Sequence, residues 1–190
     1  MKRRYELKER ARRQEQTRQR IVEAAVELHT SVGPARTTIS AIAARAGVER
    51  HTVYAHFPDE HTLIGACSAH WEARHPLPDR AALAEIEDPV RRLRLALGET
   101  YAWYESAEAD LALFVRDVSL VPANADAVGE IRAEIARIAD VASHGWPRRR
   151  SVRAAIAHAF EFETWRSLVR RQGLSQAQAV DAMARLVASG

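Results

Sequence analysis

The chain has 190 residues, of which 47% are hydrophobic, so it is long and apolar enough to bury a core and is not a globally disordered protein. Its single cysteine excludes an internal disulfide and a cysteine metal cluster. No run approaches the ~18 apolar residues of a membrane span, and the first residues lack the apolar region of a secretory signal, so we expect a cytoplasmic protein.

The formal net charge is +3 and is unevenly distributed. Residues 1–20 contain nine Lys or Arg and three Glu, whereas acidic side chains outnumber basic ones in the rest of the chain. A basic arm of this kind is suited to contacts with the phosphates of DNA, although the same composition is also typical of a solvated helix that aids solubility. After this arm, Ile21, Ala24, Ala25 and Leu28 form the apolar stripe of the first predicted helix.

The next segment, TTISAIAARAGVERHTVYAHF from Thr37 to Phe57, predicts two short helices joined by a tight turn. Thr37 and Thr38 are suitable N-caps, and Gly47 can adopt the left-handed conformation that ends a helix. Val53 and Phe57 are four apart, so we expect both to face the core and their neighbours to point outward. A small protein presents side chains to the major groove of DNA with this arrangement.

Beyond Pro58 the sequence predicts helices throughout, and no alternating strand pattern of useful length occurs. Cys67 lies in an apolar helical pattern and is expected in the core. The predicted helices cover about 60–75, about 80–85, a segment from Asp88-Pro89 to Tyr104, a separate segment marked by Leu111 to Val118, a longer segment marked by Val128 to Ala142, and finally about 148–172 and 175–188.

The helix predicted over 148–172 is apolar around much of its circumference, so it must be buried on more than one side. Small residues such as Ala154, Ala155 and Ala157 would permit a close approach of another helix. One side could therefore meet a partner subunit. Alternatively, the chain is a monomer in which the last helix covers this one.

Four consecutive stretches resemble the TetR family of bacterial transcription regulators. They are IVEAAVELHTSVG from Ile21, TTISAIAARAGV from Thr37, TVYAHF from Thr52, and PDEHTLIGA from Pro58. The C-terminal stretch FETWRSLVRRQGLS from Phe162 also resembles the end of some members. The resemblance implies an all-α fold, with a three-helix helix-turn-helix DNA-binding domain and its basic arm over residues 1–58. It also implies a helical effector-binding and dimerisation domain over residues 59–190.

In this family the last two helices form the dimer interface, so the resemblance implies a homodimer whose recognition helices are ~34–36 Å apart on a palindromic operator. Arg50 is best suited to bind a guanine, whereas Thr52 and Tyr54 are better suited to phosphates. The lysine that often follows the recognition helix is replaced by Glu60 or His61, so we expect that phosphate contact to be absent or partly recovered by protonated His61. The positions that the resemblance assigns to DNA contact are Ser40, Arg50, His51, Thr52, Tyr54 and His56.

The resemblance also implies a pocket for a small-molecule effector in the second domain. The candidates are bulky or polar residues that interrupt apolar stripes, namely Trp71, Trp103, Tyr104, Phe114, Arg116, His158, Phe162 and Trp165. So many aromatic residues would suit an apolar or aromatic effector. We therefore predict a transcriptional repressor that binds an operator as a homodimer and is released by an effector. The alternative is a DNA-binding regulator of the same fold that responds to no small molecule.

An enzyme is the competing prediction, because eight histidines invite a metal site. His51, His56 and His61 recur every five residues, but this spacing is about 500° around a helix, so neighbours point apart, and Pro58 interrupts the helix between them. The sequence contains no metalloprotease pair, glycine-rich phosphate loop or nucleophile motif. We therefore expect no catalytic residues, no metal and no cofactor.

Overall fold

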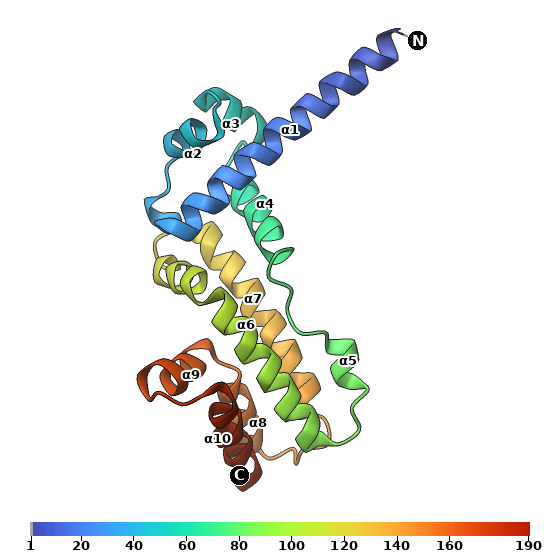
Figure 1. Ribbon diagram of the computed structural model, residues 1–190, viewed down its shortest axis with the longest axis vertical. Coiled ribbons are helices and arrows are strands. Elements are labelled where there is room, and N and C mark those ends of the chain that lie inside the picture. The colour runs from blue at the N-terminus through green and yellow to red at the C-terminus, as the bar shows by residue number, and fades with distance from the viewer. Residues whose placement is uncertain (1) are drawn as a thin grey trace. The chain divides into compact units, whose positions relative to one another are not determined.

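A computed structural model describes residues 2–190, with side chains from Tyr5 onward, and all of the regular elements in this range are helical (Figure 1). The predicted all-α fold is therefore confirmed. In chain order the elements are α1 (Lys2–Ser31), η1 (Pro34–Arg36), α2 (Ile39–Ala46), α3 (Arg50–His56), α4 (Glu60–Glu72), α5 (Arg80–Ala84), α6 (Pro89–Asp117), α7 (Pro122–Ser143), α8 (Arg150–Ala159), α9 (Phe162–Arg166), η2 (Ser167–Arg171) and α10 (Gln176–Ser189). None of the helices described is long and apolar enough to cross a membrane.

The helices divide into two compact units. The first unit comprises the chain up to Arg74 together with Ala109–Val128, and the second comprises His75–Glu108 together with Gly129–Gly190. Both α6 and α7 therefore contribute to both units. Because α4 packs against α1, it belongs to the first unit. The predicted functional division between residues 58 and 59 stays a prediction.

The first unit contains the helix-turn-helix at the predicted positions. Thr38 caps α2 by accepting a hydrogen bond from the Ala41 amide at 3.1 Å, and Gly47 ends α2 with a φ of 65°. Asp59 caps α4 by accepting from the Thr62 amide at 2.7 Å. The core of this unit is formed by the buried residues Ile21, Val22, Ala24, Ala25, Ile42, Ala43, Ala46, Val53, Phe57, Leu63 and Cys67.

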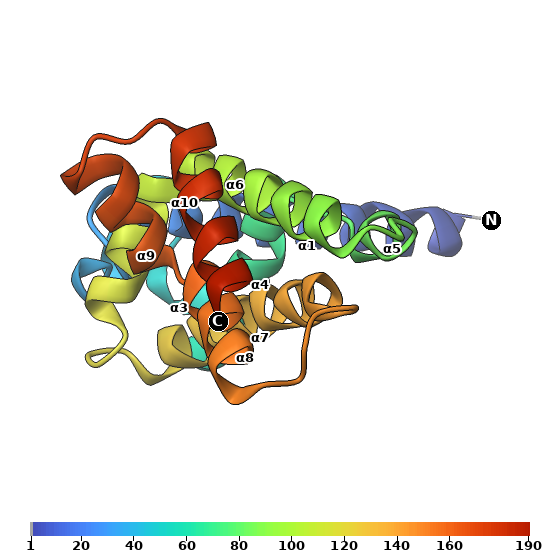
Figure 2. The ribbon, with the colours of Figure 1, turned by 90° about the horizontal axis from the view of Figure 1, so that it is seen from below.

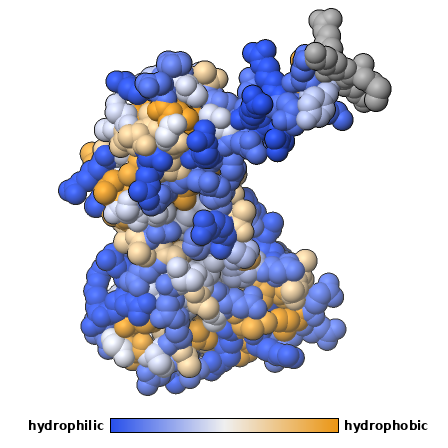
Figure 3. Space-filling view, turned by 45° about the horizontal axis from the view of Figure 1, so that its top comes forward, coloured by the Kyte–Doolittle hydropathy of each residue, from blue (hydrophilic) through white to orange (hydrophobic). Residues whose placement is uncertain are grey.

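The first helix extends much further toward the N-terminus than its apolar stripe indicates. It is continuous from Lys2 to Ser31, whereas its buried residues begin at Ile21. On the face seen in the space-filling view, the described part of this extension shows mainly hydrophilic side chains (Figure 3), and Tyr5 and Leu7 are exposed apolar residues on it. Since few of its side chains are buried, propensity and solvation, rather than packing, account for its helical form.

The turn after α1 is joined to the end of α6 by a buried carboxylate. Asp117, whose side chain is 2% exposed, accepts a hydrogen bond from the Ala35 amide at 3.0 Å, and the Arg116 guanidinium donates to both Asp117 and the Val32 carbonyl. The Arg116 guanidinium and then the Ala35 amide hold the pKa of Asp117 below its ordinary value of 3.8. Gly33, at φ 94°, leaves room for these groups because it has no side chain.

The second unit differs from the sequence-based prediction in two places. The segments from Asp88-Pro89 to Tyr104 and from Leu111 to Val118 form one helix, α6, of 29 residues. The prediction of two helices was wrong because no Gly or Pro lies between them, so the backbone continues through residues 105–110.

Conversely, the single helix predicted over 148–172 is divided into α8, α9 and the π-helical turn η2. Helix α8 ends at Ala159 with Phe160 as its C-cap, and Glu161 is extended, with a ψ of 136°. Two buried tyrosines of α6 satisfy the carbonyls at this break. The Tyr101 hydroxyl donates to the Ala159 carbonyl at 2.8 Å, and the Tyr104 hydroxyl donates to the Phe160 carbonyl at 2.5 Å. Helix α10 then packs against α8, which the two ribbon views show side by side (Figures 1 and 2).

Candidate nucleic-acid interface

Helix α3 presents an arginine and a tyrosine to solvent while its other side is anchored in the core. Val53 is 0% exposed, and Phe57, directly after the helix, is 2% exposed. Arg50 and Tyr54 lie one turn apart on the exposed side, with the Arg50 guanidinium 5.9 Å from the centre of the Tyr54 ring and 3.4 Å from its hydroxyl. The buried pair fixes the orientation of the exposed pair, as a recognition helix requires.

The other residues predicted to contact DNA lie on α2 and α3 and differ in exposure. Ser40 on α2 and His51 on α3 are exposed. Thr52 and His56 are half-buried, with the Thr52 hydroxyl 3.5 Å from a nitrogen of His51 and the His56 ring tilted against Phe57. Their roles in DNA contact stay predictions.

Thr52 and His56 form one wall of an open groove of about 590 Å³, which we name the arm groove. Its other wall is the N-terminal part of α1. The residues that line it are Tyr5, Glu6, Glu9, Arg10, Arg13, Gln14 and Thr17 of α1 and Thr52 and His56 of α3. The sequence did not indicate that these α1 residues line a groove. They share one face only if the basic arm is a continuous helix, which the sequence alone did not predict.

Helix α1 contacts the residue directly after α3 at the inner end of this groove. The Arg18 guanidinium lies over the Phe57 ring at 5.0 Å from its centre, a cation–π distance. Further out, Arg12 pairs with Glu9 at 3.1 Å on the exposed surface. The contact between Arg18 and Phe57 therefore links the start of the packed part of α1 to the residue directly after α3.

Two residues stand where the resemblance leads one to expect a phosphate-contacting lysine. Glu60 and His61 are both exposed at the start of α4. The His61 imidazole lies 3.4 Å from the carboxylate of Asp126 on α7. A protonated His61 thus already has an anionic partner within the first unit, which competes with a phosphate.

The eight residues predicted for an effector pocket belong to both units. Trp71, Phe114 and Arg116 lie in the first, and the other five lie in the second. The Trp71 indole donates to Asp110 at 2.7 Å and meets the Phe114 ring edge-on at 5.5 Å. In the second unit, the rings of Trp103, Tyr104, Phe162 and Trp165 form one cluster with centre-to-centre contacts of 5.3–5.8 Å, whereas His158 is exposed. Their role in binding an effector stays a prediction.

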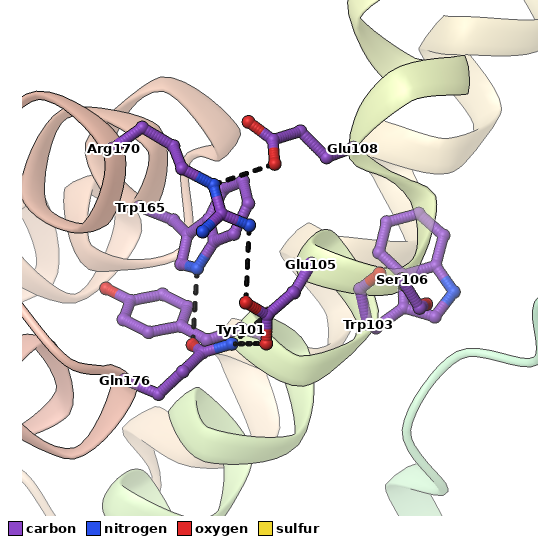
Figure 4. Close-up of polar contacts among 8 residues, drawn as sticks. All are labelled: Tyr101, Trp103, Glu105, Ser106, Glu108, Trp165, Arg170 and Gln176. Carbon is purple, nitrogen blue, oxygen red and sulfur yellow. Dashed lines mark hydrogen bonds and ion pairs between the residues drawn. The ribbon is translucent and has the colours of Figure 1, made fainter.

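A polar network that the sequence did not indicate covers one side of this aromatic cluster (Figure 4). Arg170, in the π-helical turn, donates to Glu108 at 2.8 Å and to Glu105 at 3.2 Å, and its guanidinium lies over the Trp165 ring. Gln176 donates to Glu105 at 2.8 Å and accepts from the Trp165 indole at 3.2 Å. The Gln176 hydrogen bond, followed by Arg170, lowers the pKa of Glu105. The network joins η2 and α10 to α6.

Within the described residues, no three His, Cys, Asp or Glu side chains form a group that could hold a metal ion. Burial lowers the pKa of His29 to about 4, so this imidazole is neutral inside the first unit at physiological pH. Burial also raises the pKa of the Cys67 thiol to about 12, which agrees with the predicted core position of this residue.

Residues 21–67 match the family model described as bacterial regulatory proteins, tetR family. Over 63 residues the chain is 41% identical to the HTH-type transcriptional regulator SrpR of Pseudomonas putida, and the match covers 33% of this chain and 29% of that protein. The match to SrpR therefore covers less than a third of the length of that protein.

Solved structures show the same fold over nearly the whole chain. A TetR-family transcriptional regulator from Mesorhizobium loti MAFF303099 aligns over 93% of this chain and 96% of its own, with a TM-score of 0.62 and 19% identity. FadR from Bacillus subtilis, in complex with stearoyl-CoA, aligns over 90% and 98%, with a TM-score of 0.61 and 17% identity. At these identities the likeness establishes the fold alone.

Proposed function

We propose that this chain, whose residues 21–67 match the TetR family model, is a homodimeric repressor of that family that binds a palindromic operator and releases it when a small-molecule effector binds. Such a protein acts on chromosomal DNA in the cytoplasm. It requires no catalytic residue, metal or cofactor.

The observation that carries the proposal is the outward pair on α3. Arg50 and Tyr54 are exposed on a helix whose orientation is fixed by Val53 and Phe57 in the core. The Arg50 guanidinium can donate to both acceptors of a guanine, a contact worth ~1–3 kcal/mol of discrimination. In the free protein it rests beside the Tyr54 ring, so binding requires it to leave a weak surface contact rather than a buried ion pair.

The remaining predicted contacts follow from exposure. Ser40 and His51 are exposed and can reach the DNA without rearrangement. Thr52 and Tyr54 are assigned to DNA phosphates, which position the helix without specifying sequence. His56, half-buried at the end of α3, is also assigned to the phosphate backbone of the DNA.

We assign the dimer interface to α8 and α10, which correspond to the last two helices of TetR-family proteins. Ala154 and Ala157 on α8 are exposed small residues, and Leu186 on α10 is 44% exposed, which supports burial of this region against a second copy. A two-fold pair of recognition helices would then require a spacing of ~34–36 Å on DNA.

The effector site is assigned to the second unit, at the cluster of Trp103, Tyr104, Phe162 and Trp165. The solved structures of FadR with stearoyl-CoA and of the multidrug binding protein EbrR with imidazole support an effector-responsive mechanism. An effector that prefers the state unable to meet the operator spacing weakens DNA binding by its differential affinity, typically ~1–3 kcal/mol. A thermal-shift screen separates this mechanism from a regulator without an effector, since a ligand at 100 times its Kd adds ~2.7 kcal/mol of stability.

The test of DNA binding is selection of duplexes from a random-sequence library by the purified protein. We expect enrichment of one palindrome, and we expect the double variant Arg50→Ala/Tyr54→Ala to lose selective binding to it. Arg91→Ala, an exposed arginine of α6 in the second unit, is the control and should bind like the wild type. Equal affinity and selectivity of the α3 variant and the wild type would refute the assignment of α3.

A further inference from the structure

The arm groove contains two arginines, both on α1. Arg10 and Arg13 line the groove from α1, and among the residues whose side chains are described neither makes a hydrogen bond or ion pair. Glu9, on the same wall, is engaged by Arg12, which lies outside the groove. The two guanidinium groups are therefore free to bind an anion.

The opposite wall offers neutral or positively charged donors rather than acids. Thr52 contributes a hydroxyl and His56 an imidazole, and Thr17 adds a second hydroxyl from α1. Thr17 and His56 directly precede Arg18 and Phe57, whose cation–π contact lies at the inner part of the groove. The inner groove thus combines two free cations with hydrogen-bond donors on both sides, which is the chemistry that binds phosphates.

We propose that the arm groove holds one strand of the DNA backbone beside the recognition helix, with Arg10 and Arg13 on one side of the phosphates and Thr52 and His56 on the other. The inference rests on the proposed function and assigns to α1 a contact surface on the duplex. Along a helix with a rise of about 1.5 Å per residue, Arg10 and Thr17 are about 10 Å apart. Along the duplex axis, that length spans about three phosphates of one strand, at about 3.4 Å of axial rise each.

The carboxylate of Glu6 limits which part of the groove the DNA strand can occupy. Glu6 is nearer the N-terminus than either arginine and would repel phosphates, so the strand occupies the part of the groove from Arg10 inward. With the strand in this position, α3 and α1 have different roles in DNA binding. The exposed face of α3 contacts bases through Arg50, whereas the inner face of α1 contacts backbone only and sets the register of α3 on the duplex.

The experiment compares two double variants of the same helix that remove the same charge. Arg10→Gln/Arg13→Gln changes the groove face, and Lys8→Gln/Arg20→Gln changes exposed side chains that do not line the groove. Affinity for the duplex that the wild type selects is measured by fluorescence anisotropy from 50 to 300 mM KCl, with circular dichroism as the check on folding. Each lost phosphate contact should reduce the slope of log K against log salt by ~0.9, so the groove variant should lose about 1.8 per subunit, or about 3.6 for a dimer.

At 100 mM KCl we expect the groove variant to bind about 60 times more weakly per subunit, or thousands of times more weakly for a dimer, with unchanged sequence preference. The control variant should keep nearly the wild-type slope. If both variants lose affinity and slope equally, the arm acts through diffuse charge and the inference is wrong. It is equally wrong if the groove variant keeps the wild-type slope while Arg50→Ala/Tyr54→Ala loses binding, and then the proposed function stands alone. A wild-type protein that selects no duplex overturns both.

Discussion

Replacing Gly33 with alanine tests how the turn after α1 is joined to the end of α6. Gly33 has φ 94° and ψ 157°, a conformation that essentially only glycine adopts, so any side chain costs about 1–3 kcal/mol of backbone strain. An added Cβ would also overlap the Arg116 guanidinium and lie 2.5 Å from Asp117 Oδ2. Asp117 must then withdraw from the Ala35 amide, which costs about 1–3 kcal/mol for the group left unpaired.

Together these terms predict that Gly33→Ala lowers the free energy of unfolding by roughly 2–6 kcal/mol, a large part of the stability of a typical domain. The assay is urea unfolding followed by circular dichroism, with the midpoint as the readout. Gly65→Ala is the matched control, because an added Cβ on that residue in the middle of α4 would meet no atom within 4 Å. This control should gain about 0.5–1 kcal/mol of helix stability. A Gly33→Ala protein as stable as the wild type would refute the reasoning.

Three further predictions concern buried polar groups. The pKa of Asp117 is lowered in the folded protein, so its contribution to stability is present above pH 3.8 and disappears as the pH falls through the folded pKa. The difference in unfolding free energy between the wild type and Asp117→Asn should therefore shrink in acid. A difference that does not depend on pH would contradict this. Tyr101→Phe/Tyr104→Phe removes the donors to two carbonyls at the end of α8 and should cost roughly 2–3 kcal/mol in urea unfolding, whereas wild-type stability would show that the break does not depend on them. Cys67, buried with a thiol pKa of about 12, should react with a disulfide reagent at pH 8 only after urea is added, and rapid labelling of the native protein would show that it is accessible.

The helix-turn-helix was predictable because its signals are local. A threonine cap, a glycine in the left-handed conformation and an aspartate cap each act within three or four residues, and the structure places Thr38, Gly47 and Asp59 in these roles. The burial of Val53 and Phe57 follows from helical spacing alone. The outward direction of Arg50 and Tyr54 was therefore available from the sequence.

The break after α8 was not predictable for the opposite reason. No glycine or proline marks Phe160 and Glu161, and the groups that satisfy the freed carbonyls are tyrosine hydroxyls 56 and 58 positions earlier in the chain. The arm groove escaped prediction similarly, because the relation of Arg10 and Arg13 to Thr52 and His56 depends on how α1 passes α3. Contacts between distant segments are decided by tertiary packing, which local patterns do not encode.

The most direct test of the account is the base preference of Arg50→Ala, measured by sequencing the duplexes that it and the wild type select from the same random library. If α3 binds operator DNA through this guanidinium, the variant loses its preference for guanine at one position in each half-site, by ~1–3 kcal/mol, while the other positions keep theirs. An unchanged preference at every position would contradict the claim that the exposed face of α3 specifies the operator.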